Sequence, residues 1–216
     1  MLPDNVSYED AALLDCIAVG VHAVQRFKTE MTDTAVILGD AAIGLSTMQV
    51  AKANGAKRVG VVGHHDSSLQ IAEEVGADFT INGNNDDAAE KIIELTDGLG
   101  ADVIYESVGG TATTLTEAVN MVRPGGAIVV IGSFPQQPDM NFRRLLRYEV
   151  DILFSWSYSQ WDGVPEFQIA LDLLKEGKVK AEAIITHKFP LDQINDAFHA
   201  ALNKYESKAT KVVVMT

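Results

Sequence analysis

The segment Gly39-Asp40-Ala41-Ala42-Ile43-Gly44 has the glycine spacing of a turn that binds a dinucleotide phosphate. An apolar run over 34–38 predicts a strand before it, and a pattern of helical period follows. The first glycine permits a sharp turn, and the last lets the helix pack close to the strand. The helix N-terminus then presents free N–H groups to a pyrophosphate. The residues expected to contact the pyrophosphate of NAD or NADP are Gly39, Ala41, Ala42, Ile43 and Gly44.

Two residues of this turn depart from the usual pattern. Ala41 stands where a glycine is common, and its methyl group occupies space where the backbone approaches the phosphate. Asp40 places a carboxylate near the same anion. Both departures are expected to weaken phosphate binding.

The residues after the second predicted strand bear on which cofactor is bound. A site specific for NAD usually carries an acid about 20 residues beyond the turn, where it binds the ribose hydroxyls. Here Gly63 and His64 fall at that position, and His65 follows. No carboxylate at this position repels a 2′-phosphate, and the two histidines are able to donate hydrogen bonds to one. The pattern therefore favours NADP over NAD, with Asp66 as a weaker argument for NAD.

Strand and helix patterns alternate along most of the chain. Apolar strands are predicted over 34–38, 58–62, 79–81, 103–105, 127–131 and 150–154, and helices over 11–27, 45–54, 67–75, 86–95 and 111–121. This alternation predicts an α/β fold with a doubly wound parallel sheet, the Rossmann arrangement. In the tail, a helix is predicted over 165–176. A short strand-helix-strand unit follows it, with a strand over 184–189, a helix over 191–202 and a strand over 211–214. The expected divisions are 1–30 (hinge and linking helix), 31–160 (dinucleotide-binding domain) and 161–216 (C-terminal tail).

Composition excludes several other classes of function. The chain has 216 residues and a formal net charge of −13, which disfavours a nucleic-acid partner. It has no apolar run long enough to span a membrane, and its N-terminus lacks the pattern of a signal peptide. Cys16 is the single cysteine, so no internal disulfide forms, and we expect a reducing, cytoplasmic location.

Several further motifs resemble the cofactor domain of the medium-chain, zinc-type alcohol and polyol dehydrogenases. Besides 39–44, they are Asn54-Gly55-Ala56, Glu74-Val75-Gly76-Ala77-Asp78, Gly100-Ala101-Asp102, Val108-Gly109-Gly110, Arg123-Pro124-Gly125-Gly126 and Ile185-Thr186-His187-Lys188-Phe189. The resemblance covers nearly the whole chain. It implies hydride transfer between a nicotinamide and an alcohol or carbonyl carbon.

The resemblance also implies a set of cofactor contacts. It places Val108 and Gly109 beside the nicotinamide ribose. It places Ile131, Gly132 and Ser133 against the carboxamide, and Ser155 at the last contact on the nicotinamide side. It also implies that the basic residue Lys211 reaches the pyrophosphate.

Zinc catalysis in this family needs residues that the sequence does not supply. Relatives carry a preceding catalytic domain with most of the zinc ligands, and this chain has no cluster with zinc-site spacing. Asp15 stands in the position of the last zinc ligand, with Cys16 beside it, and is a candidate remnant ligand. We therefore expect the isolated chain to bind cofactor without turning over an alcohol.

The sequence leaves three alternative functions open, and it also predicts a homodimer. A zinc-independent quinone or enone reductase fragment is disfavoured by Asp15, and a methyltransferase by the tail motifs. The third alternative is a non-catalytic nucleotide-binding module. The apolar strand 150–154 is predicted to lie at a sheet edge, which favours pairing with a second copy, and the resembling family also dimerises in this way.

Overall fold

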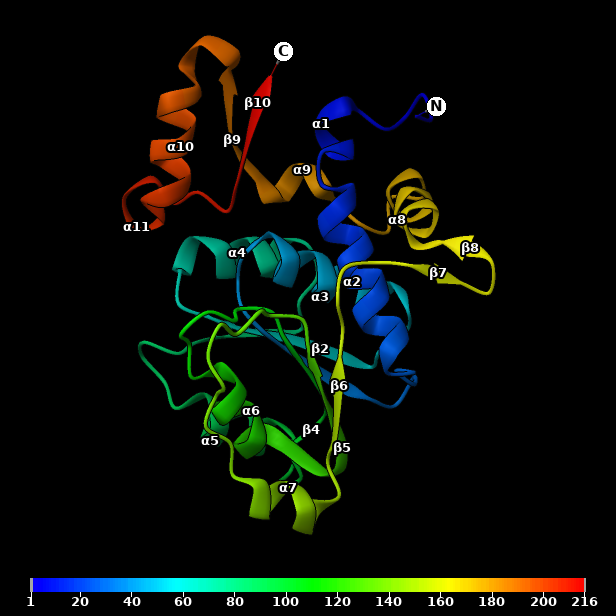
Figure 1. Cartoon of the computed structure of the whole chain (residues 1–216), viewed down its shortest axis with the longest axis vertical. Coiled ribbons are helices and arrows are strands. Elements are labelled where there is room, and N and C mark those ends of the chain that lie inside the picture. The colour runs from blue at the N-terminus through cyan, green and yellow to red at the C-terminus, as the bar shows by residue number, and fades with distance from the viewer. Residues whose placement is uncertain (1, 216) are drawn as a thin grey trace.

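Six short apolar segments form one parallel sheet in the computed structural model, which describes residues 2–215 (Figure 1). The strands are β1 (Thr34–Leu38), β2 (Arg58–Gly63), β3 (Phe79–Asn82), β4 (Ala101–Glu106), β5 (Val122–Val130) and β6 (Asp151–Phe154). Their order is β3-β2-β1-β4-β5-β6, and every neighbouring pair is parallel. The order reverses between β1 and β4, where a doubly wound sheet opens a crevice for ligands. The predicted fold class is confirmed.

Helices cover both faces of the sheet, and each face has its own apolar core. The helices before the tail are α1 (Tyr8–Ala11), α2 (Leu14–Arg26), α3 (Ala42–Ala53), α4 (Asp66–Glu74), α5 (Ala88–Leu95), α6 (Thr114–Met121) and α7 (Phe142–Tyr148). Successive strand residues point to opposite faces. In β1, Ala35 and Ile37 accordingly pack with α2, α3 and α4, whereas Val36 and Leu38 pack with α5, α6 and α7. Burial on both faces explains why β1 is apolar throughout.

The C-terminal tail joins the apolar core on the α2 and α3 side of the sheet through Ala170, Leu174 and Ile184. Its elements are β7 (Gln160–Trp161), β8 (Val164–Pro165), α8 (Glu166–Lys175), α9 (Ala181–Ile184), β9 (Ile185–Pro190), the 3-10 helix η1 (Leu191–Gln193), α10 (Ile194–Leu202), α11 (Lys204–Ser207) and β10 (Lys211–Met215). Of these, α10, β9 and β10 lie farther from the sheet (Figure 1). Strands β9 and β10 pair in parallel in a second sheet, and β7 and β8 form a hairpin. No helix within residues 2–215 is long and apolar enough to cross a membrane.

Several boundaries differ from those predicted. Strand β5 begins at Val122 instead of Ala127, because Val122 pairs with Ala101 before a register irregularity in β4. The helix predicted over 11–27 is observed as α2, and the separate short helix α1 precedes it. The short elements β7, β8, α9 and α11 were not predicted, since two to four residues carry too little periodicity to be recognised.

Candidate dinucleotide-binding site

The turn between β1 and α3 has the geometry that its glycines predict. Gly39 has φ +119°, a conformation that side chains rarely adopt. A Cβ atom on Gly44 would lie 2.0 Å from the carbonyl oxygen of Gly39, so this contact excludes any side chain. The first helical hydrogen bond of α3 runs from the N–H of Leu45 to the oxygen of Ala41. The N–H groups before Leu45 therefore lie at an open helix N-terminus, the arrangement that binds phosphate groups.

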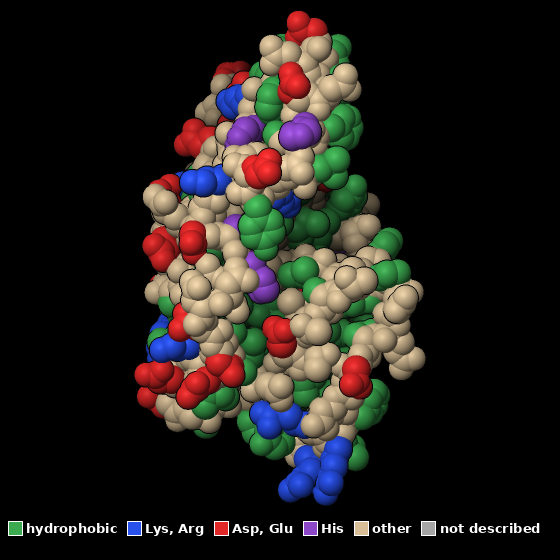
Figure 2. Space-filling view, turned by 90° about the vertical axis from the view of Figure 1, so that its left-hand side faces the viewer, with side chains coloured by type: hydrophobic (Ala, Val, Ile, Leu, Met, Phe, Trp, Pro, Cys, Tyr) green, Lys and Arg blue, Asp and Glu red, His purple; other side chains and the backbone are tan. Residues whose placement is uncertain are grey.

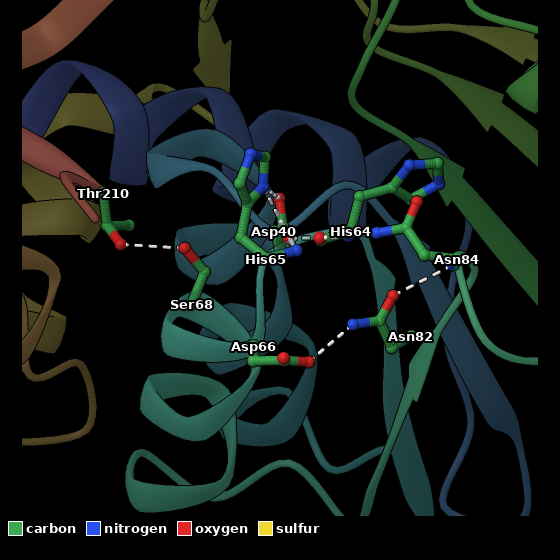
Figure 3. Close-up of polar contacts among 8 residues, drawn as sticks. All are labelled: Asp40, His64, His65, Asp66, Ser68, Asn82, Asn84 and Thr210. Atoms are coloured by element: carbon green, nitrogen blue, oxygen red, sulfur yellow. Dashed lines mark hydrogen bonds and ion pairs between the residues drawn. The ribbon is translucent and has the colours of Figure 1, made fainter. Parts of the chain in front are cut away.

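Asp40 is engaged by the loop after β2 instead of standing free beside the turn (Figure 3). One of its oxygens accepts hydrogen bonds from the backbone N–H groups of His64 and His65, each at 2.8 Å. The same oxygen lies 3.1 Å from Nδ1 of His65. The residue is 7% exposed. Asp40, which the sequence places near the phosphate, is thus a buried carboxylate that joins two loops.

Gly63 ends β2 against this carboxylate. A Cβ atom at position 63 would lie 2.4 Å from an oxygen of Asp40. A side chain at position 63 and the observed conformation of Asp40 are therefore mutually exclusive. This explains physically why no acid projects from the end of β2 at this position.

The loops that follow β4 and β5 contact each other through two glycines. A Cβ on Gly109 would lie 2.6 Å from the nitrogen of Ser133, and one on Gly132 would lie 2.4 Å from the nitrogen of Gly109. The N–H of Gly110 also donates to the oxygen of Ser133 at 2.7 Å. The residues predicted from the resemblance to meet the nicotinamide ribose and carboxamide are thus brought together, with Val108 48% exposed at their edge.

Glu106 organises this pair of loops, and the sequence analysis did not identify it. One carboxylate oxygen accepts hydrogen bonds from the N–H groups of Val108 and Gly109, at 2.9 and 3.0 Å, and from the hydroxyl of Thr114 at 2.7 Å. The side chain is fully buried, and its other oxygen has no partner among the described residues. An acid at the end of an otherwise apolar strand was the signal that could have identified it.

A cavity of about 590 Å³ lies beyond the ends of β5 and β6. Its lining includes Ile131, Gly132, Ser133, Ser155 and Trp156. Ser155 is 3% exposed and its hydroxyl has no partner within residues 2–215. A buried hydroxyl without a partner is costly, so this group is available to a polar ligand. The predicted carboxamide segment and Ser155 therefore share one cavity.

A second cavity, of about 500 Å³, lies at the end of β2. It is lined by His64, His65, Asp66, Ser67, Gln70, Asn82, Asn84, Asn85, Lys204, Tyr205 and Lys208. Figure 2 shows this side of the molecule, with histidine side chains in a hollow between its upper and lower parts. The two histidines predicted to be near a 2′-phosphate are brought together with two lysines from the tail. Those lysines were not among the predicted site residues.

The candidate metal ligand and the predicted pyrophosphate lysine lie near each other. Asp15 is exposed on α2, and Nζ of Lys211 lies 3.8 Å from the sulfur of Cys16. Burial raises the pKa of the Cys16 thiol to about 11, so the thiol is protonated near neutral pH. Within residues 2–215, no three His, Cys, Asp or Glu side chains gather closely enough to hold a metal ion.

The comparisons with known proteins agree with this geometry. The profile of a family described as zinc-binding dehydrogenase matches residues 42–176. Sorbitol dehydrogenase of Bacillus subtilis (strain 168) is 32% identical over 216 residues, which cover 99% of this chain and 59% of that protein. D-arabitol-phosphate dehydrogenase of Enterococcus avium is 31% identical over 211 residues, which cover 96% of this chain and 58% of that protein.

A solved structure shows the same fold. An oxidoreductase/dehydrogenase from Escherichia coli superposes with a TM-score of 0.91 at 29% sequence identity, covering 99% of this chain and 59% of that one. The chain thus spans somewhat more than half the length of these relatives. Both the sequence motifs and the glycine-lined crevice are accounted for by this relationship. The chain therefore belongs to the zinc-binding dehydrogenase family, in which it corresponds to the cofactor-binding part.

Proposed function

We propose that this chain binds a nicotinamide dinucleotide and orients it for hydride transfer in a zinc-dependent alcohol or polyol dehydrogenase. The observation that carries the proposal is the turn from Gly39 to Gly44. It lies at the reversal of strand order between β1 and β4, and its two glycines allow the close strand–turn–helix packing that places the N-terminus of α3 at this crevice. The names of the two relatives, which act on sorbitol and on D-arabitol phosphate, support a polyol as the substrate class.

The proposed contribution of this chain is positional. The pyrophosphate is bound at the N-terminus of α3, with Lys211 as a further cationic partner. The nicotinamide ribose lies beside Val108 and Gly109. The backbone of 131–133 and the hydroxyl of Ser155 then hold the carboxamide, which determines the face of the ring that meets a substrate.

The described residues do not fit a zinc site. Asp15 is the single candidate ligand, and it lies exposed on α2 beside a protonated thiol. A catalytic zinc takes about three protein ligands. The proposed role of residues 2–215 is therefore limited to binding and orienting the cofactor.

We further propose a preference for NADP over NAD. Gly63 replaces the acid that would repel a 2′-phosphate, and Asp40 is already occupied by hydrogen bonds from the loop after β2. Each charge-assisted hydrogen bond to the 2′-phosphate contributes enough binding energy for a preference of about tenfold or more.

Calorimetric titration of the chain with NADPH and with NADH tests both parts of this proposal. We expect both cofactors to bind, with NADPH binding about tenfold more tightly. Binding of neither cofactor would contradict the proposed function. Equal affinities, or tighter NADH binding, would contradict the preference alone.

The proposal also covers assembly and location. Among residues 2–215, β6 pairs with β5 alone, and we propose that a homodimer forms through the other edge of β6. A single buried cysteine suits a reducing compartment, and we propose the cytoplasm.

A further inference from the structure

We propose that Lys204 and Lys208, which belong to the C-terminal tail, bind the 2′-phosphate of NADP and so make the tail the cofactor-selecting element. This inference rests on the proposed function, because it assigns a role within the same dinucleotide site. It concerns the cavity of about 500 Å³ at the end of β2, which both lysines line.

The cavity lies where a 2′-phosphate would be. In a doubly wound sheet the pyrophosphate sits on the turn after β1, and the adenosine ribose extends toward the end of β2. Asp40 connects these two places, since it belongs to the turn and binds the backbone of His64 and His65. The cavity begins at the same two histidines.

The tail is fixed at this cavity by two contacts. The hydroxyls of Ser68 in α4 and Thr210 lie 2.9 Å apart although the residues are 142 positions apart in the sequence (Figure 3). Both residues are buried. The rings of His65 and Tyr205 approach to 4.8 Å between centroids. Thr210 and Tyr205 flank Lys208, and Tyr205 adjoins Lys204, so both lysines are held over the end of β2.

The charges around the cavity suit a dianion. Neither Lys204 nor Lys208 forms an ion pair with any residue in the described range. Asp66 is the one carboxylate in the lining, and an oxygen of its side chain accepts a hydrogen bond from Asn82 at 2.5 Å. Asp40 does not line the cavity, and one of its oxygens accepts hydrogen bonds from the N–H groups of His64 and His65. In a chain of net charge −13, two lysines without an ion pair in the described range are therefore concentrated at a pocket that holds one carboxylate, Asp66.

The lining also supplies the hydrogen-bond donors that a phosphate needs. Ser67, Gln70 and Asn84 reach the cavity along with the two histidines. A ribose that carries two hydroxyls calls for an acceptor such as a carboxylate, which position 63 has no room to provide. Two lysines and several neutral donors outweigh the single carboxylate of the lining, Asp66, so the cavity matches a phosphate ester better than a diol.

The test compares Lys204→Met, Lys208→Met and the double variant with the unchanged chain. Lys178→Met is the matched control, because Lys178 pairs with Glu176 outside the cavity. Dissociation constants are measured by calorimetry for NADPH, NADH and the probe 2′,5′-ADP, and circular dichroism verifies folding. We expect the double variant to bind NADPH and 2′,5′-ADP about tenfold or more weakly, with NADH binding and the control variant unchanged. Arginine at both positions should restore most of the loss.

The remaining outcomes of these titrations distinguish failure of the inference from failure of the proposed function. If the unchanged chain binds both cofactors but the lysine variants leave their ratio intact, the inference is wrong and the proposed function stands. An equal loss for NADPH and NADH in folded variants would also overturn it, since the lysines would then serve the pyrophosphate or the fold. If the unchanged chain binds no cofactor, the proposed function fails first and the inference fails with it.

Discussion

At the scale of single residues, positions 40 and 63 depend on each other. A carboxylate on the phosphate turn occupies the space that a side chain at the end of β2 would need, and its oxygens hold the loop after β2 in place. Asp40 read by itself suggests electrostatic repulsion of the phosphate. The paired geometry shows a buried group whose charge is compensated by two N–H groups and the ring of His65.

Gly44→Val should abolish cofactor binding. Its Cβ would lie 2.0 Å from the oxygen of Gly39, so the turn and the start of α3 must separate. Overpacking of this kind costs about 1–3 kcal/mol of folding stability, and it displaces the N–H groups that we propose bind the pyrophosphate. Calorimetry with NADPH measures the loss, with circular dichroism to verify the fold.

Ala53→Val is the control for this substitution. Ala53 lies at the other end of α3 and is partly exposed, so the same residue type is introduced far from the turn. The control should retain affinity. A folded Gly44→Val protein with unchanged affinity would show that the turn does not bind the cofactor.

At the scale of elements, the edge of the sheet formed by β6 is exposed and apolar. Strand β6 forms one edge, and its Phe154 is 69% exposed next to Trp156, which is 76% exposed. Large apolar side chains on an edge strand favour pairing with another strand, and the carbonyl oxygen of Phe154 already accepts a hydrogen bond from Nε of Arg26 at 3.1 Å. The edge-strand position predicted for 150–154 is confirmed, whereas the dimer that it suggests remains a prediction.

The unchanged chain should be a dimer in solution, and Phe154→Lys should shift it toward monomer. A lysine on an edge strand opposes pairing with a second strand. Light scattering coupled to size-exclusion chromatography measures the mass over a range of concentrations. Leu202→Lys is the matched control, since Leu202 is 80% exposed on α10, away from this edge. A monomer at high concentration of the unchanged chain would rule the interface out.

At the scale of the whole molecule, binding and chemistry are separable. We propose that the two cavities and the glycine turn hold the adenosine, pyrophosphate and nicotinamide parts of a cofactor. Within residues 2–215 there is no cluster of side chains that could bind a metal ion. Loss of one electrostatic element that stabilises a developing oxyanion costs on the order of a hundredfold or more in rate.

We therefore predict no measurable alcohol dehydrogenase turnover by this chain alone. The assay mixes the chain with zinc, NADP or NAD, and a panel of alcohols and polyols, and follows nicotinamide reduction by absorbance. Gly44→Val serves as the control without cofactor binding. Steady turnover that follows the protein through purification and is lost in Gly44→Val would contradict this prediction.

The sequence by itself determined the parallel sheet and the phosphate turn. Both arise from local patterns, since apolar strands of five or so residues, helical periods and the Gly39–Gly44 spacing are each contained within a short segment. The strand β1 was predicted with its observed ends, and β2, β3 and β6 to within one residue. The motifs were also sufficient to indicate the family that the comparisons confirmed.

Tertiary structure decided which side chains share a site. The direction of Asp40, the role of Glu106 in holding two loops, and the arrival of Lys204 and Lys208 beside His65 all depend on contacts between distant segments. Such contacts follow from how crossovers and the tail pack on the sheet, and no local periodicity encodes them. A local pattern therefore predicts the dinucleotide turn, whereas the lysines that we propose select NADP reach the end of β2 only through the packing of the tail.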